Sequence, residues 1–160
     1  MSVPFRLPLF VLAVSVLALA FAFVAEFGFG LRPCILCLTQ RVPFAIAGGL
    51  AALALLPAVR PVVRRRLMAA AGLAFLVNSG IAVYHVGVEQ KWWASSCAAA
   101  PAGPVPAGDL AAMMSKPVEA RCDEPAWQWH GITMAAMNVP FSGGLALIVL
   151  VLAARRKEWR

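Results

Sequence analysis

Two cysteines three residues apart are the first residues in the chain whose types and spacing could support chemistry. Cys34 and Cys37 form a Cys-x-x-Cys motif, and Arg41 follows four residues after Cys37. On a helix, residues three and four apart lie on one face, so the two thiols and the guanidinium would be neighbours. Pro33 precedes the motif, and proline is common where a helix begins. Because a helix start stabilises a thiolate, the motif predicts a reactive dithiol.

A second pair, Cys97 and Cys122, brings the number of cysteines to four. Four cysteines in a short chain indicate a disulfide framework, a metal site or a redox relay. Structural disulfides are disfavoured, because a Cys-x-x-Cys bridge closes a small loop and adds little stabilisation. A zinc site completed by His85 or His130 is also disfavoured, since the separation of the second pair is not that of a zinc ribbon. We therefore expect no metal, while the pairing of the cysteines stays open among three arrangements.

The composition indicates that these residues are carried by a membrane protein. The chain is 62% hydrophobic and 13% charged, with a mean hydropathy of +0.81. A soluble domain is about a quarter charged. We expect one membrane domain over residues 1–160, an all-α four-helix bundle, because four uncharged runs are long enough to cross a bilayer. The expected spans are about 7–27, 42–59, 67–88 and 132–154, and the expected outer loops are 28–41 and 89–131.

Three local features concern the first run, the start of the second helix and the long outer loop. The first run is longer than the apolar core of a typical signal peptide, so we expect a retained span. The second helix could begin at Pro33 or at Pro43, and this choice decides whether the Cys-x-x-Cys lies on the helix or in a loop. Residues 109–116 within the long loop are compatible with a short surface helix that ends at Pro117.

The basic residues predict the orientation in the membrane. The net charge is +7, but the positive residues cluster beside apolar runs, which argues against a nucleic-acid-binding surface. Most of the 14 Lys and Arg residues lie near residue 6, between residues 60 and 66, or after residue 154. The positive-inside rule then puts both termini in the cytoplasm and all four cysteines outside. In bacteria that outer compartment is oxidising and allows disulfides.

Four polar residues within or beside the spans have competing interpretations. His85 could be a functional residue or a buried residue with satisfied hydrogen bonds, because ionisable groups within a span are costly. Asn78 and Asn138 are expected to form hydrogen bonds between helices. Glu26, at the end of the first span, is either an interfacial charge or a functional acid, and the interfacial interpretation is favoured.

Together these features resemble the DsbB family, the bacterial disulfide bond formation proteins B. The resemblance covers nearly the whole chain and rests on the topology, on both cysteine pairs and on short motifs. The motifs are Gln40-Arg41 after the Cys-x-x-Cys, residues 84–89 (Tyr-His-Val-Gly-Val-Glu) with Trp92-Trp93 before Cys97, and residues 121–125 (Arg-Cys-Asp-Glu-Pro) with Trp127 before the last span.

The resemblance implies an enzyme of the inner membrane, a protein-disulfide:quinone oxidoreductase. Such an enzyme reoxidises a periplasmic thiol oxidase of thioredoxin fold (DsbA-like) and passes the electrons to ubiquinone or menaquinone. By position, Cys97 would be attacked by the partner's thiolate, and Cys122 would complete the outer disulfide. Cys37 would lie beside the quinone, and Cys34 would exchange with the outer pair. Arg41 and, less directly, His85 match residues near the quinone.

Two other interpretations remain. An enzyme similar to vitamin K epoxide reductase also combines a Cys-x-x-Cys with a loop pair, but its motif is expected near the last core span rather than before the second. A small membrane scaffold with structural disulfides would contain the same residues without turnover. The identity of the quinone does not follow from the sequence.

Overall fold

The computed structural model describes residues 3–97 and 120–159, and these form a bundle of four long helices. They are α1 (Val3–Phe23), α2 (Ile35–Leu55), α3 (Pro61–Glu89) and α5 (Met134–Ala154). A π-helical turn, η1 (Val24–Gly28), continues α1, and a 3-10 turn, η2 (Arg156–Trp159), follows α5. Each of the four helices is long and apolar enough to cross a membrane. The expected all-α transmembrane bundle is confirmed, and the chain is a multi-pass membrane protein.

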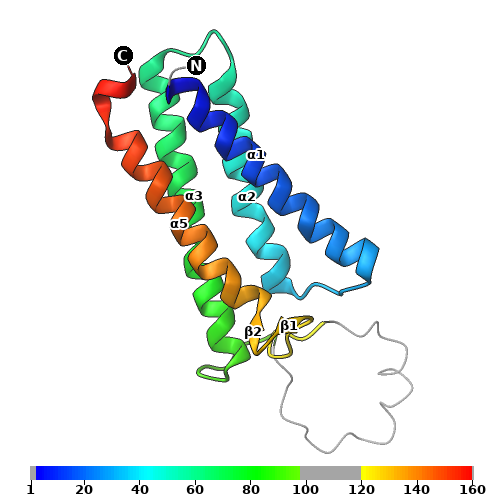
Figure 1. Ribbon diagram of the computed structural model, residues 1–160. Helices are drawn as coiled ribbons and strands as arrows, with labels where there is room; N and C mark the ends of the chain where they lie inside the picture. Colours follow the sequence, from blue (N-terminus) through cyan, green and yellow to red (C-terminus); the bar gives the residue numbers. More distant parts are fainter. Residues whose placement is uncertain (1–2, 98–119, 160) are drawn as a thin grey trace, which may run out of the picture.

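The helices that pack most extensively are α3 with α5, α2 with α3 and α1 with α2, and α5 also reaches α2 through Asn138. Both chain ends and the α2–α3 connection lie at one end of the bundle (Figure 1). We call this the basic end, after residues Arg60, Arg64, Arg65 and Arg66. A two-stranded antiparallel hairpin, β1 (Gln128–Trp129) and β2 (Ile132–Thr133), lies at the other end. We call that the redox end, because it carries all four cysteines.

Close helix contacts come from small residues. Ala47, Ala51, Ala54 and Ala71 are fully buried, and a Cβ on Gly72 of α3 would come within 2.8 Å of Leu150 on α5. Small side chains let helix backbones approach within a membrane, where van der Waals packing replaces the hydrophobic effect. Large apolar side chains such as Leu17, Phe21 and Leu147 are exposed instead. This inside-out distribution is what a lipid-facing surface requires.

The second helix begins earlier than the expected span. The expected span covers residues 42–59 and leaves residues 28–41 in a loop, whereas α2 runs from Ile35 to Leu55. Pro43 lies inside the helix, where transmembrane helices tolerate proline. Cys34 is the residue that caps the helix, and its sulfur accepts a hydrogen bond from the Cys37 N–H. Of the two possible starts, the structure therefore has the one beside Pro33.

The third helix is also longer than the expected span at 67–88. It begins at Pro61, so Arg64, Arg65 and Arg66 lie on its first turns rather than between the expected second and third spans. Proline at the first helical position supplies the required φ and loses no hydrogen bond. The surface helix expected at 109–116 lies outside the described residues.

Candidate active site

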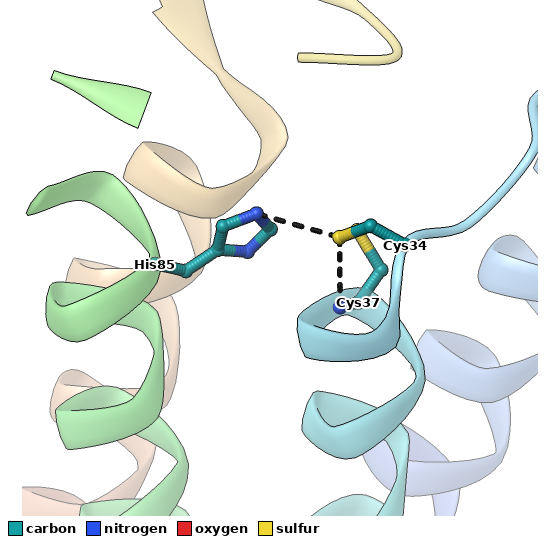
Figure 2. A group of neighbouring side chains, drawn as sticks. All are labelled: Cys34, Cys37 and His85. Carbon is teal, nitrogen blue, oxygen red and sulfur yellow. Dashed lines mark hydrogen bonds between the residues drawn. The ribbon is translucent and has the colours of Figure 1, made fainter. Parts of the chain in front are cut away.

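Cys34 and Cys37 meet at the start of α2. Their sulfurs are 3.0 Å apart, and the Cys34 sulfur accepts a hydrogen bond from the Cys37 N–H at 3.3 Å. Both cysteines are free thiols in the structure. Cys34 is buried and Cys37 is partly exposed. Figure 2 shows the two side chains at the helix end, with His85 pointing toward them from α3.

This position makes Cys34 acidic. The hydrogen bond from the Cys37 thiol lowers the pKa of Cys34, a hydrogen bond from His85 lowers it further, and burial opposes both, with a net pKa of about 4. The helix N-terminus acts in the same direction, because its free N–H groups and positive dipole end favour a thiolate. We call Cys34 and Cys37 the inner pair. Of these two, Cys34 is the cysteine that lies outside the span and is prepared to leave, or to attack, as a thiolate.

His85 connects this dithiol to α3 and to the hairpin. Its Nε2 lies 3.6 Å from the Cys34 sulfur and 3.8 Å from a carboxylate oxygen of Glu89, one helical turn away. The other oxygen of Glu89 accepts a 2.6 Å hydrogen bond from the Thr133 hydroxyl. Thr133 also caps α5 by accepting from the Ala136 N–H. The start of α5 thus fixes Glu89, which in turn faces His85.

The same three side chains have the donor atoms of a metal site. Ligand atoms of Cys34, Cys37 and His85 lie within 4.8 Å of one another. Two thiolates bound to one zinc ion at about 2.3 Å in tetrahedral geometry are roughly 3.7 Å apart. The observed sulfur separation of 3.0 Å is shorter than this. The arrangement suits a pair that opens and closes a disulfide better than one that shares an ion.

The remaining ring nitrogen of His85 belongs to a buried polar chain. Gln40 Nε2 lies 2.8 Å from His85 Nδ1, and Asn138 donates to Gln40 Oε1 at 2.6 Å. Ser142 donates to Asn138 Oδ1 at 2.7 Å, and Asn78 donates to the Ser142 hydroxyl at 2.8 Å. These contacts join α2, α3 and α5. The expectation that Asn78 and Asn138 form interhelical hydrogen bonds is confirmed.

Cys97 and Cys122 form a disulfide. The Cys122 N–H also donates to the Cys97 carbonyl at 2.9 Å. Cys122 is fully buried with Cys34 and Val88 in one cluster, while Cys97 is only partly buried at its edge. A cavity of about 340 Å³ is lined by Cys34, Cys37, His85 and the segment that follows Cys122. The two cysteine pairs are therefore neighbours, and Cys122 is the cysteine of the disulfide that shares the buried cluster with Cys34.

Arg41 lies on a larger cavity. The cavity measures about 660 Å³, and its walls are mainly apolar side chains of α1, α2 and α5. Cys37, Gln40, Arg41 and His85 line it as well. Arg41 forms a 2.6 Å ion pair with Glu26 and lies 5.1 Å from the centre of the Phe23 ring. Glu26, expected to be an interfacial charge, is thus the partner of the site arginine.

The structure brings most of the predicted site residues together and adds others. The inner cysteines and His85 form one contact group, and Arg41 shares the large cavity with Cys37 and His85. Gln40, Glu89 and Asn138 were not predicted as site residues. For Glu89 a signal existed, since it follows His85 by four residues and so shares its helix face. Neither Gln40 nor Asn138 carries any sequence sign of its contact with the other.

A transmembrane bundle with a free dithiol at a helix start, a disulfide packed against it and an apolar cavity below it defines a membrane thiol oxidoreductase. The family model described as "Disulfide bond formation protein DsbB" matches residues 5–152. The chain therefore belongs to the DsbB family, whose members are membrane disulfide-forming oxidoreductases. No curated protein and no solved structure matches the chain.

Proposed function

We propose that the chain, acting as a single membrane domain, oxidises a periplasmic dithiol protein of thioredoxin fold and transfers the electrons to a membrane quinone. The observation that carries this proposal is that the two sulfurs of the Cys-x-x-Cys motif have different neighbours. Cys34 shares a buried cluster with Cys122 of the outer disulfide, and Cys37 lines the 660 Å³ apolar cavity. A path for electrons from an outer disulfide to a lipid-soluble acceptor requires both contacts.

The orientation in the inner membrane is part of the proposal. The basic end would face the cytoplasm, because its arginines follow the positive-inside rule. Both termini lie at that end and would be cytoplasmic. The redox end would then face the periplasm, where a dithiol partner has access to it. Cys97 is only partly buried, which makes it the sulfur of the outer disulfide that a partner would reach.

The outer exchange begins when a partner thiolate attacks the Cys97 sulfur. The Cys97–Cys122 bond breaks, a partner–Cys97 disulfide forms, and Cys122 leaves as a thiolate. Cys122 then attacks Cys34 of an oxidised Cys34–Cys37 pair, forming a Cys34–Cys122 disulfide and releasing the Cys37 thiolate. Thiol–disulfide exchange requires the attacking sulfur to reach its target, and the shared burial of Cys34 and Cys122 supports this choice.

The second half of the exchange restores the outer disulfide. The second thiolate of the partner attacks the partner's own mixed-disulfide sulfur, and Cys97 leaves. Cys97 then attacks Cys122, and Cys34 leaves as a thiolate. The partner has lost two electrons, and the inner pair has gained them as a dithiol. The low pKa of Cys34 supports its role as the leaving group in this last exchange, because thiols of lower pKa leave faster.

The larger cavity has the features that a quinone site needs. Its apolar walls suit a prenyl chain and a ring, and its polar residues suit a head group that acquires charge. Arg41 would stabilise that charge, since a guanidinium is always protonated. Cys37 would be the thiolate nearest the ring. A bound ubiquinone or menaquinone would supply a two-electron acceptor.

Turnover of the purified protein tests the function. A reduced thioredoxin-fold dithiol protein and a soluble quinone analogue are mixed with the protein in detergent, and quinone reduction is followed by absorbance. We expect Cys34→Ser and Cys37→Ser to abolish quinone reduction. Cys97→Ser and Cys122→Ser should abolish partner oxidation, yet leave a chemically reduced inner pair oxidisable by quinone.

The competing interpretations give different outcomes in the same assay. A membrane scaffold would show no turnover, and its disulfides would not exchange with the partner. An enzyme similar to vitamin K epoxide reductase would also reduce an epoxide of the quinone with electrons from the thiol partner, so an added epoxide that stays unreduced would exclude it. Coupled turnover in the Cys34→Ser variant would show that the relay is wrong, and comparison of ubiquinone with menaquinone analogues would identify the acceptor.

A further inference from the structure

The buried polar chain beside the dithiol has a direction. Asn78 donates to Ser142, Ser142 donates to Asn138 and Asn138 donates to Gln40. The Gln40 amide nitrogen then faces His85 Nδ1, and His85 Nε2 faces the Cys34 sulfur. Each donor thus faces the next residue on the way to the Cys34 sulfur. Asn78 Oδ1, at the start of this chain, has no partner among the described residues.

The direction determines where His85 carries its proton. The Gln40 oxygen is occupied by the Asn138 N–H, so the Gln40 group that faces His85 is the NH₂, which can only donate. Nδ1 must therefore offer a lone pair. A neutral imidazole has one N–H, so the proton lies on Nε2. Nε2 is the nitrogen 3.6 Å from the Cys34 sulfur, where an N–H stabilises a thiolate and a lone pair would repel it.

We propose that Asn138 is a positioning residue, which orients the Gln40 amide and thereby fixes His85 as the tautomer that donates to the Cys34 sulfur. Asn138 lies on α5, and among the described residues its hydrogen bonds go to Gln40, Asn78 and Ser142 rather than to the inner cysteines or His85. It acts through Gln40 alone. The proposal rests on the exchanging role proposed for Cys34 and deepens it.

Charged groups also surround His85. A carboxylate oxygen of Glu89 lies 3.8 Å from Nε2 and favours an N–H on that nitrogen. A proton on Nδ1 would instead bring two donors, Nδ1–H and the Gln40 NH₂, face to face. The other charged residues that line the two cavities with His85 are Glu26, Arg32, Arg41, Arg121 and Glu124.

Nitrogen NMR of the imidazole tests the tautomer directly. The reduced protein is labelled with ¹⁵N-histidine in detergent, and His130→Gln assigns the signals, because the chain has only two histidines. We expect a neutral His85 protonated at Nε2. In Asn138→Leu, which removes the donor to Gln40 at similar volume, we expect the Nδ1-protonated form to appear.

The pH profile of Cys34 alkylation supplies the second measurement. We expect its midpoint to rise by about one unit in Asn138→Leu, which is about a tenfold lower rate in the acidic range. Ser142→Ala is the matched control. It removes a buried hydrogen bond of the same chain but leaves the Asn138–Gln40 contact, so it should lower the melting temperature without moving the profile.

A purely structural role for Asn138 would move neither measurement, or would move both equally in Asn138→Leu and Ser142→Ala. Either result, or an imidazolium at His85 in the unmodified protein, would overturn the proposal. If Asn138→Leu does not fold, Gln40→Glu replaces it, because a carboxylate cannot donate to Nδ1 and should leave that nitrogen protonated. Neither experiment needs quinone or partner, so their failure would leave the proposed function standing.

Discussion

At the scale of single residues, the site depends on which of two adjacent thiols holds the negative charge. Cys34 receives the backbone N–H of residue 37, the Cys37 thiol and His85 Nε2. Cys37 instead lines the cavity beside Arg41. The two cysteines thus have different surroundings although only two residues separate them. In the proposed function this difference would divide the work, with Cys34 exchanging disulfides and Cys37 facing the acceptor.

Removal of the Cys37 thiol should raise the pKa of Cys34. The thiol is the largest cause of the lowered pKa, and a hydrogen bond to a charged group contributes about 1.5–3 kcal/mol, or roughly one to two pKa units. We expect Cys37→Ala to shift the midpoint of Cys34 alkylation upward by that amount. In the unmodified protein the thiolate should persist as the pH falls, until about pH 4. Alkylation by iodoacetamide, followed by mass spectrometry, measures both midpoints.

Cys37→Ser is the matched control for this experiment, because its hydroxyl can still donate to the Cys34 sulfur. Its midpoint should stay close to that of the unmodified protein. Equal midpoints in Cys37→Ala and Cys37→Ser would mean that the helix N-terminus and His85 account for the acidity without the neighbouring thiol.

Residue type, spacing and the resemblance to the DsbB family together predicted part of this site. The four cysteines stand out in an apolar sequence, the spacing puts Arg41 beside Cys37, and the resemblance adds His85. The role of Gln40 could not be predicted, because a neutral amide has no preferred chemistry until its partners are known. Its partners are Asn138, 98 residues away, and His85, 45 residues away. Only the packing of α2 against α3 and α5 brings them together.

At the scale of elements, helix number followed from hydropathy, but helix starts did not. Four apolar runs predict four spans wherever the runs lie, since length and composition suffice. The start of α2 depended on a choice between Pro33 and Pro43, and membrane helices tolerate proline at either position. The cap formed by the Cys34 sulfur decides this start. A sulfur cap is not among the usual N-cap side chains, so no pattern in the chain predicts it.

Arg64 holds three helices together at the basic end. Its side chain is buried and donates to the carbonyl oxygens of Ala54 and Leu56, which end α2. The guanidinium also lies 4.2 Å from the centre of the Phe5 ring on α1. A cation at a helix C-terminus satisfies carbonyls that have no partner within the helix. Arg64 therefore stabilises the bundle through specific contacts, and its role differs from that of an exposed arginine such as Arg66.

We expect Arg64→Gln to destabilise the protein by about 2–4 kcal/mol, because two charge-assisted hydrogen bonds are lost and a buried carbonyl is left unpaired. Arg66→Gln changes the same charge at an exposed position and should cost less than about 0.5 kcal/mol. Unfolding in a mixed-micelle denaturant series compares the two variants. Similar losses would show that the cluster acts through its total charge rather than through the contacts of Arg64.

At the scale of the whole molecule, charge and chemistry lie at opposite ends. The α2–α3 connection and both termini share the basic end, while the dithiol, the disulfide and the hairpin share the redox end. Because the number of spans is even, both termini lie at the same end of the bundle. If the positive-inside rule sets the orientation, the same charges that orient the bundle also put every cysteine in an oxidising compartment.

Labelling of intact cells tests this orientation. Ala58, exposed in the α2–α3 connection, is replaced by cysteine, and cells are treated with a mild reductant and a membrane-impermeant maleimide. We expect Cys97 to be labelled in intact cells and Ala58→Cys only after the membrane is permeabilised. The two positions lie at opposite ends of the same molecule, so each serves as the control for the other. The reverse pattern would put the redox end in the reducing cytoplasm. A disulfide oxidase of this arrangement could not maintain its outer disulfide there. That result would therefore contradict both the orientation and the proposed function.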